Sequence, residues 1–257
     1  MSTDGSGAGR RPRGRRRPHV DGEGDQITMA AENYLLSIFM VQEEGLPVTN
    51  ANLVHQLKRT PASEGLGTSP PSVAGMLKRM SADSLITVGE KREVRLTSKG
   101  KTFAERIVRR HRLAERMVVD LLGLDLSKAH VEAHRLEHAI SDVLEERIRA
   151  VLGDPVTCPF GHPIPGSGYK APSSGSMPIN QAPVDTPMVV DRIPEEDQEL
   201  LEYLVASGIV PGAALEVTEV APYRGVLTVR VGGRVGGRTA ALGLEVSERV
   251  RVRKADQ

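Results

Sequence analysis

The chain has 257 residues, of which 39% are hydrophobic and 26% charged, and its formal net charge is +1. This length predicts two or three modules, and the composition is that of a globular protein. No apolar run approaches the roughly 20 residues that span a bilayer, so we expect no membrane association. A single cysteine, Cys158, rules out an internal disulfide, and the N-terminus lacks the apolar core of a secretory signal. We therefore expect a cytoplasmic protein.

The N-terminus is rich in arginine. Six arginines lie between Arg10 and Arg17, among glycines and prolines that can bury little surface. We expect residues 1–28 to form a disordered tail. Such a tail either solubilises the chain or makes a weak, salt-sensitive contact with phosphates.

The next segment, residues 29–98, predicts three helices followed by a hairpin. Apolar side chains in residues 34–41 recur with helical spacing. Thr49 is a candidate N-cap for a second helix, and Ser69–Ser72 opens a third. Residues 85–97 alternate around a glycine as two strands. Three helices and a hairpin are the plan of a winged helix-turn-helix domain, which points to DNA binding.

The remainder of the chain predicts two further modules. Residues 99–154 indicate two long helices, the second spanning about Ser127 to Leu152. Residues 155–188 hold many of the 17 prolines, so we expect an extended connector rather than a packed element. Residues 189–257 show alternating runs separated by glycine pairs, which predicts a small β-barrel. The expected fold class is therefore α+β.

The strongest chemical signal lies in the second long helix. Four side chains that commonly bind metals share one face of it: His130, His134, Glu137 and His138. Their spacing of i, i+4, i+7 and i+8 keeps them within an arc of roughly 80–100°. Such a set predicts a metal site, the alternative being a solvated polar face. The apolar stripe of the same helix, which includes Val143 and Leu144, is expected to face the core.

A second pair, His111 and Glu115, has the spacing i, i+4 on the preceding helix. Antiparallel packing of the two long helices would bring this pair to the four side chains named above. The two helices together are therefore expected to hold metal.

Three motifs carry a resemblance to a known family: residues 110–116, the histidine and glutamate set, and the Pro159–Gly166 motif. With them, the chain from about Ala30 onward resembles the diphtheria toxin repressor family of iron- and manganese-dependent regulators. The resemblance implies a winged helix-turn-helix domain and a helical domain for dimerisation with two metal sites per subunit. It also implies an SH3-like (FeoA-like) domain behind a proline-rich linker.

The resemblance implies two ligand sets. It assigns an ancillary site to His111, Glu115 and His130, with Glu195 of the β domain as a further ligand. It assigns a primary, regulatory site to Asn33, His134, Glu137 and His138.

This sequence departs from the iron-sensing pattern at both sulfur ligands. The usual methionine is Asn33 and the usual cysteine is His134, and Glu32 is an alternative to Asn33. A nitrogen and oxygen set suits Mn²⁺ or Fe²⁺. In the β domain, Arg192 stands where a second acid would be. Outside these sets, we expect turn or linker roles for Cys158 and His162.

The third helix is the expected DNA reader. Small groups at its N-terminus let a helix approach base edges, and basic residues follow on the helix and on the wing. The candidate DNA contacts are Ser69, Pro70, Pro71, Ser72, Lys78, Arg79, Lys91 and Arg92. Gly75 stands where the family has a base-reading glutamine, so we expect DNA shape to carry more of the readout.

These expectations combine into one function. A metal-loaded homodimer is expected to bind palindromic operator DNA and repress metal-homeostasis genes, with Fe²⁺ or Mn²⁺ bound. A metal held by Asn33 and the dimerisation helix would clamp the reader to the scaffold. His138→Ala should then abolish activation, and His111→Ala should cost less. Deleting residues 1–26 should leave the metal-dependent specificity for operator DNA intact.

Two alternatives come from other classes of protein. One is a metal-independent winged-helix regulator. The other is a metalloenzyme, but the His-Glu-x-x-His motif is missing from the sequence, so we do not expect an enzyme.

Overall fold

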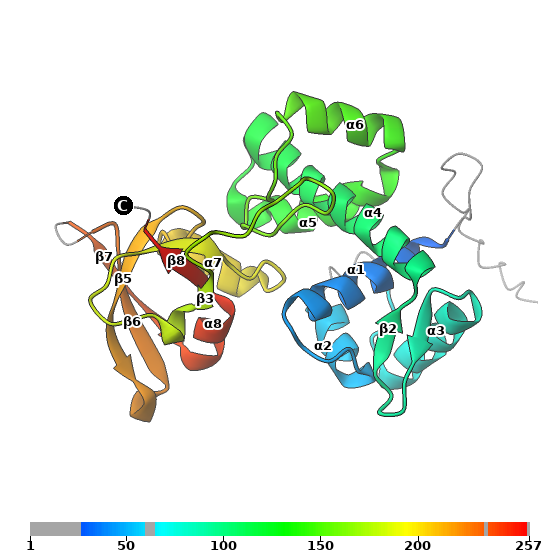
Figure 1. Cartoon of the computed structure of the whole chain (residues 1–257), viewed down its shortest axis with the longest axis horizontal. Coiled ribbons are helices and arrows are strands. Elements are labelled where there is room, and N and C mark those ends of the chain that lie inside the picture. The colour runs from blue at the N-terminus through cyan, green and yellow to red at the C-terminus, as the bar shows by residue number, and fades with distance from the viewer. Residues whose placement is uncertain (1–26, 60–64, 234–235, 256–257) are drawn as a thin grey trace, which may run out of the picture.

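The computed structural model describes residues 27–59, 65–233 and 236–255. Nearly all of the predicted N-terminal tail, and residues 60–64 before the third helix, lie outside this range. The described chain forms an N-terminal part of helices and a hairpin, a central helical part and a C-terminal part built on a sheet (Figure 1). None of its helices combines the length and apolar character that a membrane crossing requires.

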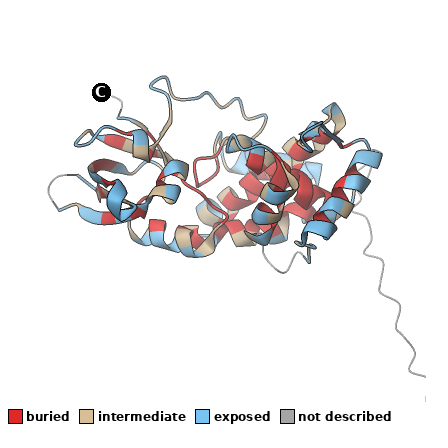
Figure 2. Cartoon of the chain, turned by 90° about the horizontal axis from the view of Figure 1, so that it is seen from below, coloured by how far each residue is buried: buried red, intermediate tan, exposed pale blue. Residues whose placement is uncertain are grey.

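The N-terminal part has the three helices and the hairpin that the sequence predicts. The elements are α1 (Met29–Glu43), α2 (Asn50–Arg59), α3 (Pro70–Ala82), β1 (Ile86–Val88) and β2 (Val94–Leu96). Side-chain caps begin the helices: Thr49 Oγ1 accepts from the Asn52 amide at 3.2 Å, and Ser69 Oγ accepts from the Ser72 amide at 3.3 Å. Buried residues line the inward sides of these helices and form one core (Figure 2).

The hairpin meets the central part at a close backbone approach. Helix α4 (Ser98–Arg116) begins after Thr97, whose Oγ1 accepts from the Gly100 amide. A Cβ at Gly100 would lie 1.8 Å from the carbonyl oxygen of Leu85, so only glycine fits. The wing is thereby fixed to the helix that carries His111. That helix continues into the π-helical turn η2 (Met117–Leu121).

The second long helix is broken, and its prediction as one helix was wrong. Helix α5 (Leu126–Leu136) gives way to the 3₁₀ turn η3 (Glu137–Ala139), and α6 (Asp142–Val151) follows. The break has a local cause, because the Ser141 side chain accepts from the Leu144 amide and so caps a new helix. Beyond the break, Val143 and Leu144 are 79% and 45% exposed rather than in the core.

The proline-rich connector is partly packed, which corrects the expectation of an extended segment. Cys158 and Phe160 are fully buried and share one hydrophobic core with the C-terminal sheet and with Val118 and Ala129 of the central helices. Gly161 has a φ of +89°, and a Cβ there would lie 2.0 Å from the Asp191 carbonyl oxygen. The connector therefore packs against both the central helices and the sheet that it precedes.

Six strands among the described residues form one antiparallel sheet, in the order β3-β8-β4-β5-β6-β7. The strands are β3 (Met177–Pro178), β4 (Met188–Arg192), β5 (Ala214–Ala221), β6 (Val226–Val231), β7 (Arg238–Gly243) and β8 (Arg251–Lys254). The helices of this part are α7 (Gln198–Ala206) and α8 (Leu244–Arg249), with the 3₁₀ turns η4 (Ile179–Gln181) and η5 (Pro222–Arg224). Bulges interrupt the register in β4 and β5. Bulges of this kind increase strand twist and bend.

Candidate metal centre

The candidate ligands converge from four separate segments of the chain. They are Glu32 and Asn33 on α1, His111 and Glu115 on α4, His130, His134, Glu137 and His138 on α5 and η3, and Glu195 after β4. Every one of these side chains belongs to a buried residue. Polar groups at such depth require partners, and here they find one another.

The four residues predicted for the ancillary site lie together. His111 Nε2 lies 2.9 Å from Glu115 Oε1 and 3.2 Å from His130 Nδ1. His130 Nδ1 is also 3.2 Å from Glu115 Oε1. Glu195 supplies a fourth ligand atom, and the four atoms lie within 4.8 Å of one another.

One oxygen of this cluster marks where a cation fits. Glu115 Oε2 is buried and has no hydrogen-bond partner among the described residues. A buried carboxylate oxygen without a partner is costly, and a divalent ion held by two imidazoles and two carboxylates would satisfy it. Nitrogen and oxygen donors suit Mn²⁺ and Fe²⁺. The donor set therefore fits a divalent metal ion.

The residues predicted for the primary site form a network around His138. His138 Nε2 lies 3.1 Å from Asn33 Oδ1 and 3.3 Å from Glu137 Oε1. Glu137 Oε1 is also 3.3 Å from His134 Nδ1. On the other side of the His138 ring, Nδ1 lies 2.8 Å from Glu32 Oε2. Asn33 and Glu137 thus contact the same nitrogen of His138, Nε2, whereas Glu32 contacts the other nitrogen, Nδ1.

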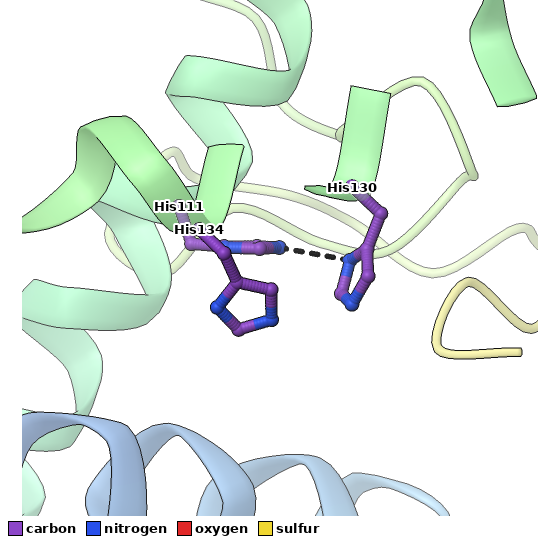
Figure 3. A group of neighbouring side chains, drawn as sticks. All are labelled: His111, His130 and His134. Atoms are coloured by element: carbon purple, nitrogen blue, oxygen red, sulfur yellow. Dashed lines mark hydrogen bonds between the residues drawn. The ribbon is translucent and has the colours of Figure 1, made fainter. Parts of the chain in front are cut away.

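The two sets are adjacent rather than separate. His111 Nδ1 contacts Glu137 Oε2, which joins a residue of each set. The rings of His111, His130 and His134 have centroids 4.7 to 4.9 Å apart, and one nitrogen of each lies within 4.8 Å of the others. Figure 3 shows the three side chains converging, with His111 and His130 in hydrogen-bond contact.

Burial and charge act in opposite directions on these groups. Burial lowers the pKa of His111, but Glu115 and Glu137 raise it well above its usual value. Burial raises the pKa of Glu137, but His134 and His111 lower it to about 2. For Glu195, burial and the charge of Glu115 together raise the pKa to about 7. The carboxylates therefore favour positive charge at this point, which a metal ion would supply.

Sequence reasoning missed a partly buried ion pair beside the candidate metal centre. Arg112 follows His111 on α4, and its Nη1 lies 3.2 Å from Oε1 of Glu43, the last residue of α1. A second contact joins Arg112 Nη2 to the other oxygen of Glu43. Glu43 also lies 3.2 Å from Nδ1 of His162. Local spacing carries no signal for contacts between residues so far apart in the sequence.

Cys158 and His162 lie in the packed connector near the ancillary cluster. Cys158 Sγ lies 3.6 Å from Glu195 Oε2, and His162 Nε2 lies 3.0 Å from the Ile193 carbonyl oxygen. Burial raises the pKa of the Cys158 thiol well above its usual value. The expected turn role of His162 is compatible with these contacts, which tie the connector to the segment that carries Glu195.

The predicted DNA contacts are exposed. This holds for all of Ser69, Pro70, Pro71, Ser72, Lys78, Arg79, Lys91 and Arg92. The Ser69 and Ser72 hydroxyls lie 2.8 Å apart, and the Ser69 hydroxyl caps α3. At Gly75, a Cβ would meet only Arg79 Nη1, at 4.0 Å, so the position is open.

Known proteins match most of the chain. Residues 97–166 match the family model "Iron dependent repressor, metal binding and dimerisation domain", and residues 177–254 match the FeoA domain. The "Iron-dependent repressor IdeR" of Mycobacterium leprae is 33% identical over 217 residues, which is 80% of this chain and 90% of that protein. The "Diphtheria toxin repressor" of Corynebacterium diphtheriae is 40% identical over 135 residues, which is 52% of this chain and 56% of that protein.

Solved structures agree with these relatives. A structure described as "Manganese-dependent transcriptional repressor complex with manganese" matches with a TM-score of 0.75 and 30% identity. The match covers 88% of this chain and 100% of that one. A second structure, described as "Manganese-dependent transcriptional repressor", matches with a TM-score of 0.64 and 27% identity, covering 86% of this chain and 98% of that one.

Proposed function

The chain belongs to the diphtheria toxin repressor family, and we propose that it is a metal-dependent transcriptional repressor activated by Mn²⁺ or Fe²⁺. In this proposal it acts in the cytoplasm, binds palindromic operator DNA as a dimer and controls metal-homeostasis genes. The observation that carries the proposal is the convergence of buried nitrogen and oxygen donors from α1, α4, α5, η3 and the segment after β4.

The primary site of the proposal consists of Asn33, His134, Glu137 and His138. Asn33 rather than Glu32 completes it, because Asn33 Oδ1 shares the Nε2 side of His138 with Glu137. Ligating histidines commonly donate their other N–H to a carboxylate, and Glu32 is placed to accept from Nδ1 of His138. Glu32 therefore orients the imidazole.

The ancillary site of the proposal consists of His111, Glu115, His130 and Glu195. Three of these belong to the central helices, and Glu195 belongs to the C-terminal part. A bound ion would supply positive charge among donors that come from the central and C-terminal parts. The primary set likewise joins α1 of the reader to η3 of the scaffold, which favours one orientation of the reader.

The central part is the proposed dimerisation domain. It lies within the match to a dimerisation domain at residues 97–166 and exposes several large apolar side chains. These are Leu121, Leu122, Val143, Leu144 and Val151. Apolar side chains gathered on one domain are typical of interaction sites, and a second copy would cover them. Two-fold symmetry would then set the recognition helices one DNA turn, about 34 Å, apart.

The proposed domains are a reader at residues 29–98, a central domain at 99–154, a connector at 155–188 and a C-terminal domain at 189–257. The FeoA match begins at residue 177, and β3 already pairs with β8. Both observations support an earlier start for the C-terminal domain, at Met177.

The test of this proposal is duplex binding titrated with metal. Operator sequences would be selected from a random duplex pool in Mn²⁺, and binding would be compared in Mn²⁺, Fe²⁺, Zn²⁺ and a chelator. We expect Mn²⁺ and Fe²⁺ to activate binding and Glu137→Ala to abolish the response. Equal binding with and without chelator would favour the metal-independent regulator instead.

A further inference from the structure

One arginine of the C-terminal domain contacts the DNA reader. Arg249 ends α8, and its Nη2 lies 3.0 Å from Glu44 Oε1 and 2.6 Å from Glu196 Oε2. Glu44 caps the C-terminus of α1, and Glu196 lies between β4 and α7. Figure 1 shows α8 on the side of the C-terminal part that faces α1. A single guanidinium thus bridges two parts of the chain that are far apart in sequence.

The bridge is partly dehydrated. The side chains of Arg249, Glu44 and Glu196 are 18%, 27% and 5% exposed. Fully exposed ion pairs contribute little because water and salt screen them, whereas pairs shielded from water interact more strongly. The buried Glu196 contact therefore fixes the guanidinium within the C-terminal part, and the more exposed Glu44 contact joins it to the reader.

Arg249 lies among several acidic side chains, whose negative charge it offsets. Arg249, Glu44 and Glu196 line a cavity of about 590 Å³, whose wall also carries Glu245 and Glu248. Of the arginines in this wall, Arg249 is the one whose guanidinium contacts Glu44 in the described part of the chain. Without it, carboxylates of the two domains would face one another across the cavity. Like charges repel, so loss of Arg249 would separate the surfaces.

The same arginine contacts the residue next to a candidate metal ligand. Its partner Glu196 directly follows Glu195, the ancillary candidate from this domain. Glu195 and Glu196 are both buried, so an ion that fixed Glu195 would also hold in place the backbone that carries Glu196. Arg249 extends that restraint to Glu44 and hence to α1, which carries Asn33.

We propose that Arg249 is a positioning residue that braces the DNA reader against the C-terminal domain and couples the ancillary metal site to the orientation of α1. The inference rests on the proposed function, because it concerns how bound metal reaches the reader. Arg249 itself touches neither metal nor DNA in this scheme. The C-terminal domain thereby gains a defined part in activation.

A double-mutant cycle tests the brace. Binding of the selected duplex would be titrated against Mn²⁺ for Arg249→Ala, Glu44→Gln, the double variant and Arg249→Lys. We expect each of the first two to raise the Mn²⁺ midpoint by roughly threefold to tenfold, and the double variant to do no more than the larger single effect. Arg249→Lys should recover part of the loss because it keeps the charge.

The matched control is Arg224→Ala. Arg224 is half exposed and pairs with Glu219 within the C-terminal domain, so its loss removes an ion pair without touching the reader. We expect a wild-type Mn²⁺ midpoint for this variant. The proposal is overturned if the Mn²⁺ midpoint shifts of the two single variants multiply in the double variant. It is also overturned if Arg249→Ala has the wild-type midpoint.

Amide hydrogen exchange provides a readout that needs no DNA. Residues 40–46 and 244–250 should exchange more slowly in Mn²⁺ than in chelator for the wild type, and Arg249→Ala should abolish that difference at both segments. Unchanged exchange in Arg249→Ala contradicts the inference. If wild-type DNA binding ignored Mn²⁺, the proposed function would fail, while the exchange comparison would still decide whether Arg249 joins the two domains.

Discussion

His111 and Glu137 are in direct contact, although the family pattern assigns them to different metal sites. Both side chains are fully buried, and His111 also contacts Glu115 and His130 of its own set. Removing the imidazole would therefore leave the Glu137 carboxylate short of a partner. The two sites share this contact, so a substitution in one site is expected to weaken metal binding at the other.

His111→Ala should accordingly weaken activation by Mn²⁺ without abolishing it. We expect the bound Mn²⁺ to fall from two ions per subunit toward one, and the midpoint for DNA binding to rise on the order of tenfold, as for loss of an orienting partner. His138→Ala should abolish the response. His55→Ala, on the exposed surface of α2, is the control for Mn²⁺ stoichiometry. Equal losses in His111→Ala and His138→Ala would replace the two-site clamp by one binuclear switch.

Glu43→Gln should change the acid stability of the protein. Burial raises the pKa of Glu43, but His162 and Arg112 lower it from 4.5 to about 2. A carboxyl group whose pKa is lower in the folded than in the unfolded protein stabilises the fold. This stabilisation is complete above the unfolded-state pKa and is lost as the pH falls through the folded-state pKa. The contribution at neutral pH is on the order of 3 kcal/mol.

Urea unfolding measures this effect. The difference in the free energy of unfolding between wild type and Glu43→Gln should be full at pH 7 and shrink as the pH falls from about 4.5 toward 2. Glu90→Gln, on the exposed wing, should show no such difference. A Glu43→Gln difference that stayed constant over the acid range would count against the ion pair.

Two glycines on helices should respond to alanine in opposite directions. A Cβ at Gly75 has open space, so Gly75→Ala should stabilise α3 by about 0.5–1 kcal/mol. A Cβ at Gly100 would overlap the Leu85 carbonyl oxygen, and Gly100→Ala should destabilise by about 1–3 kcal/mol or more. Thermal unfolding of the two variants checks the pair, and a neutral Gly100→Ala would refute the close approach of wing and α4.

Val143→Asp should dissociate the dimer. Val143 is 79% exposed on α6, within the residues that match a dimerisation domain, and a charge buried there would lack a partner. Sedimentation at micromolar concentration in Mn²⁺ should give a folded monomer. Val184→Asp, at a 47% exposed site of the C-terminal part, should remain dimeric. An unchanged Val143→Asp dimer would move the interface away from α6.

Periodicity and capping residues were sufficient to predict the three helices and the hairpin of the N-terminal part, and residue types were sufficient to predict side chains that gather at the candidate metal centre. Thr49 and Ser69 begin helices as expected, because side-chain caps act within three residues of their own position. The same rule applied to Ser141 would have revealed the break before α6. A strong run of helical spacing concealed that local signal.

Contacts between distant segments could not be predicted in this way. Glu43 and Arg112, or Glu44 and Arg249, are ordinary charged residues in the sequence, where most such residues lie on the surface. Their partners depend on how three domains pack, which no local spacing encodes. The packing of Cys158 and Phe160 was concealed by their proline-rich surroundings for the same reason.

The docked connector also determines how often the C-terminal domain meets the rest of the chain. Because the segment from Cys158 to Ile164 is largely buried against its neighbours, the free tether is only the stretch of about ten residues between Gly166 and Met177. A flexible chain of that length spans roughly 17 Å, against roughly 32 Å for the whole proline-rich segment. Effective concentration falls as the −3/2 power of the number of residues in the tether, so a tether of about 10 residues rather than about 34 raises it about sixfold. At the millimolar effective concentrations of short tethers, a contact must contribute about 4 kcal/mol to be formed half of the time, so the single arginine acts together with the apolar core that the sheet shares with Val118 and Ala129.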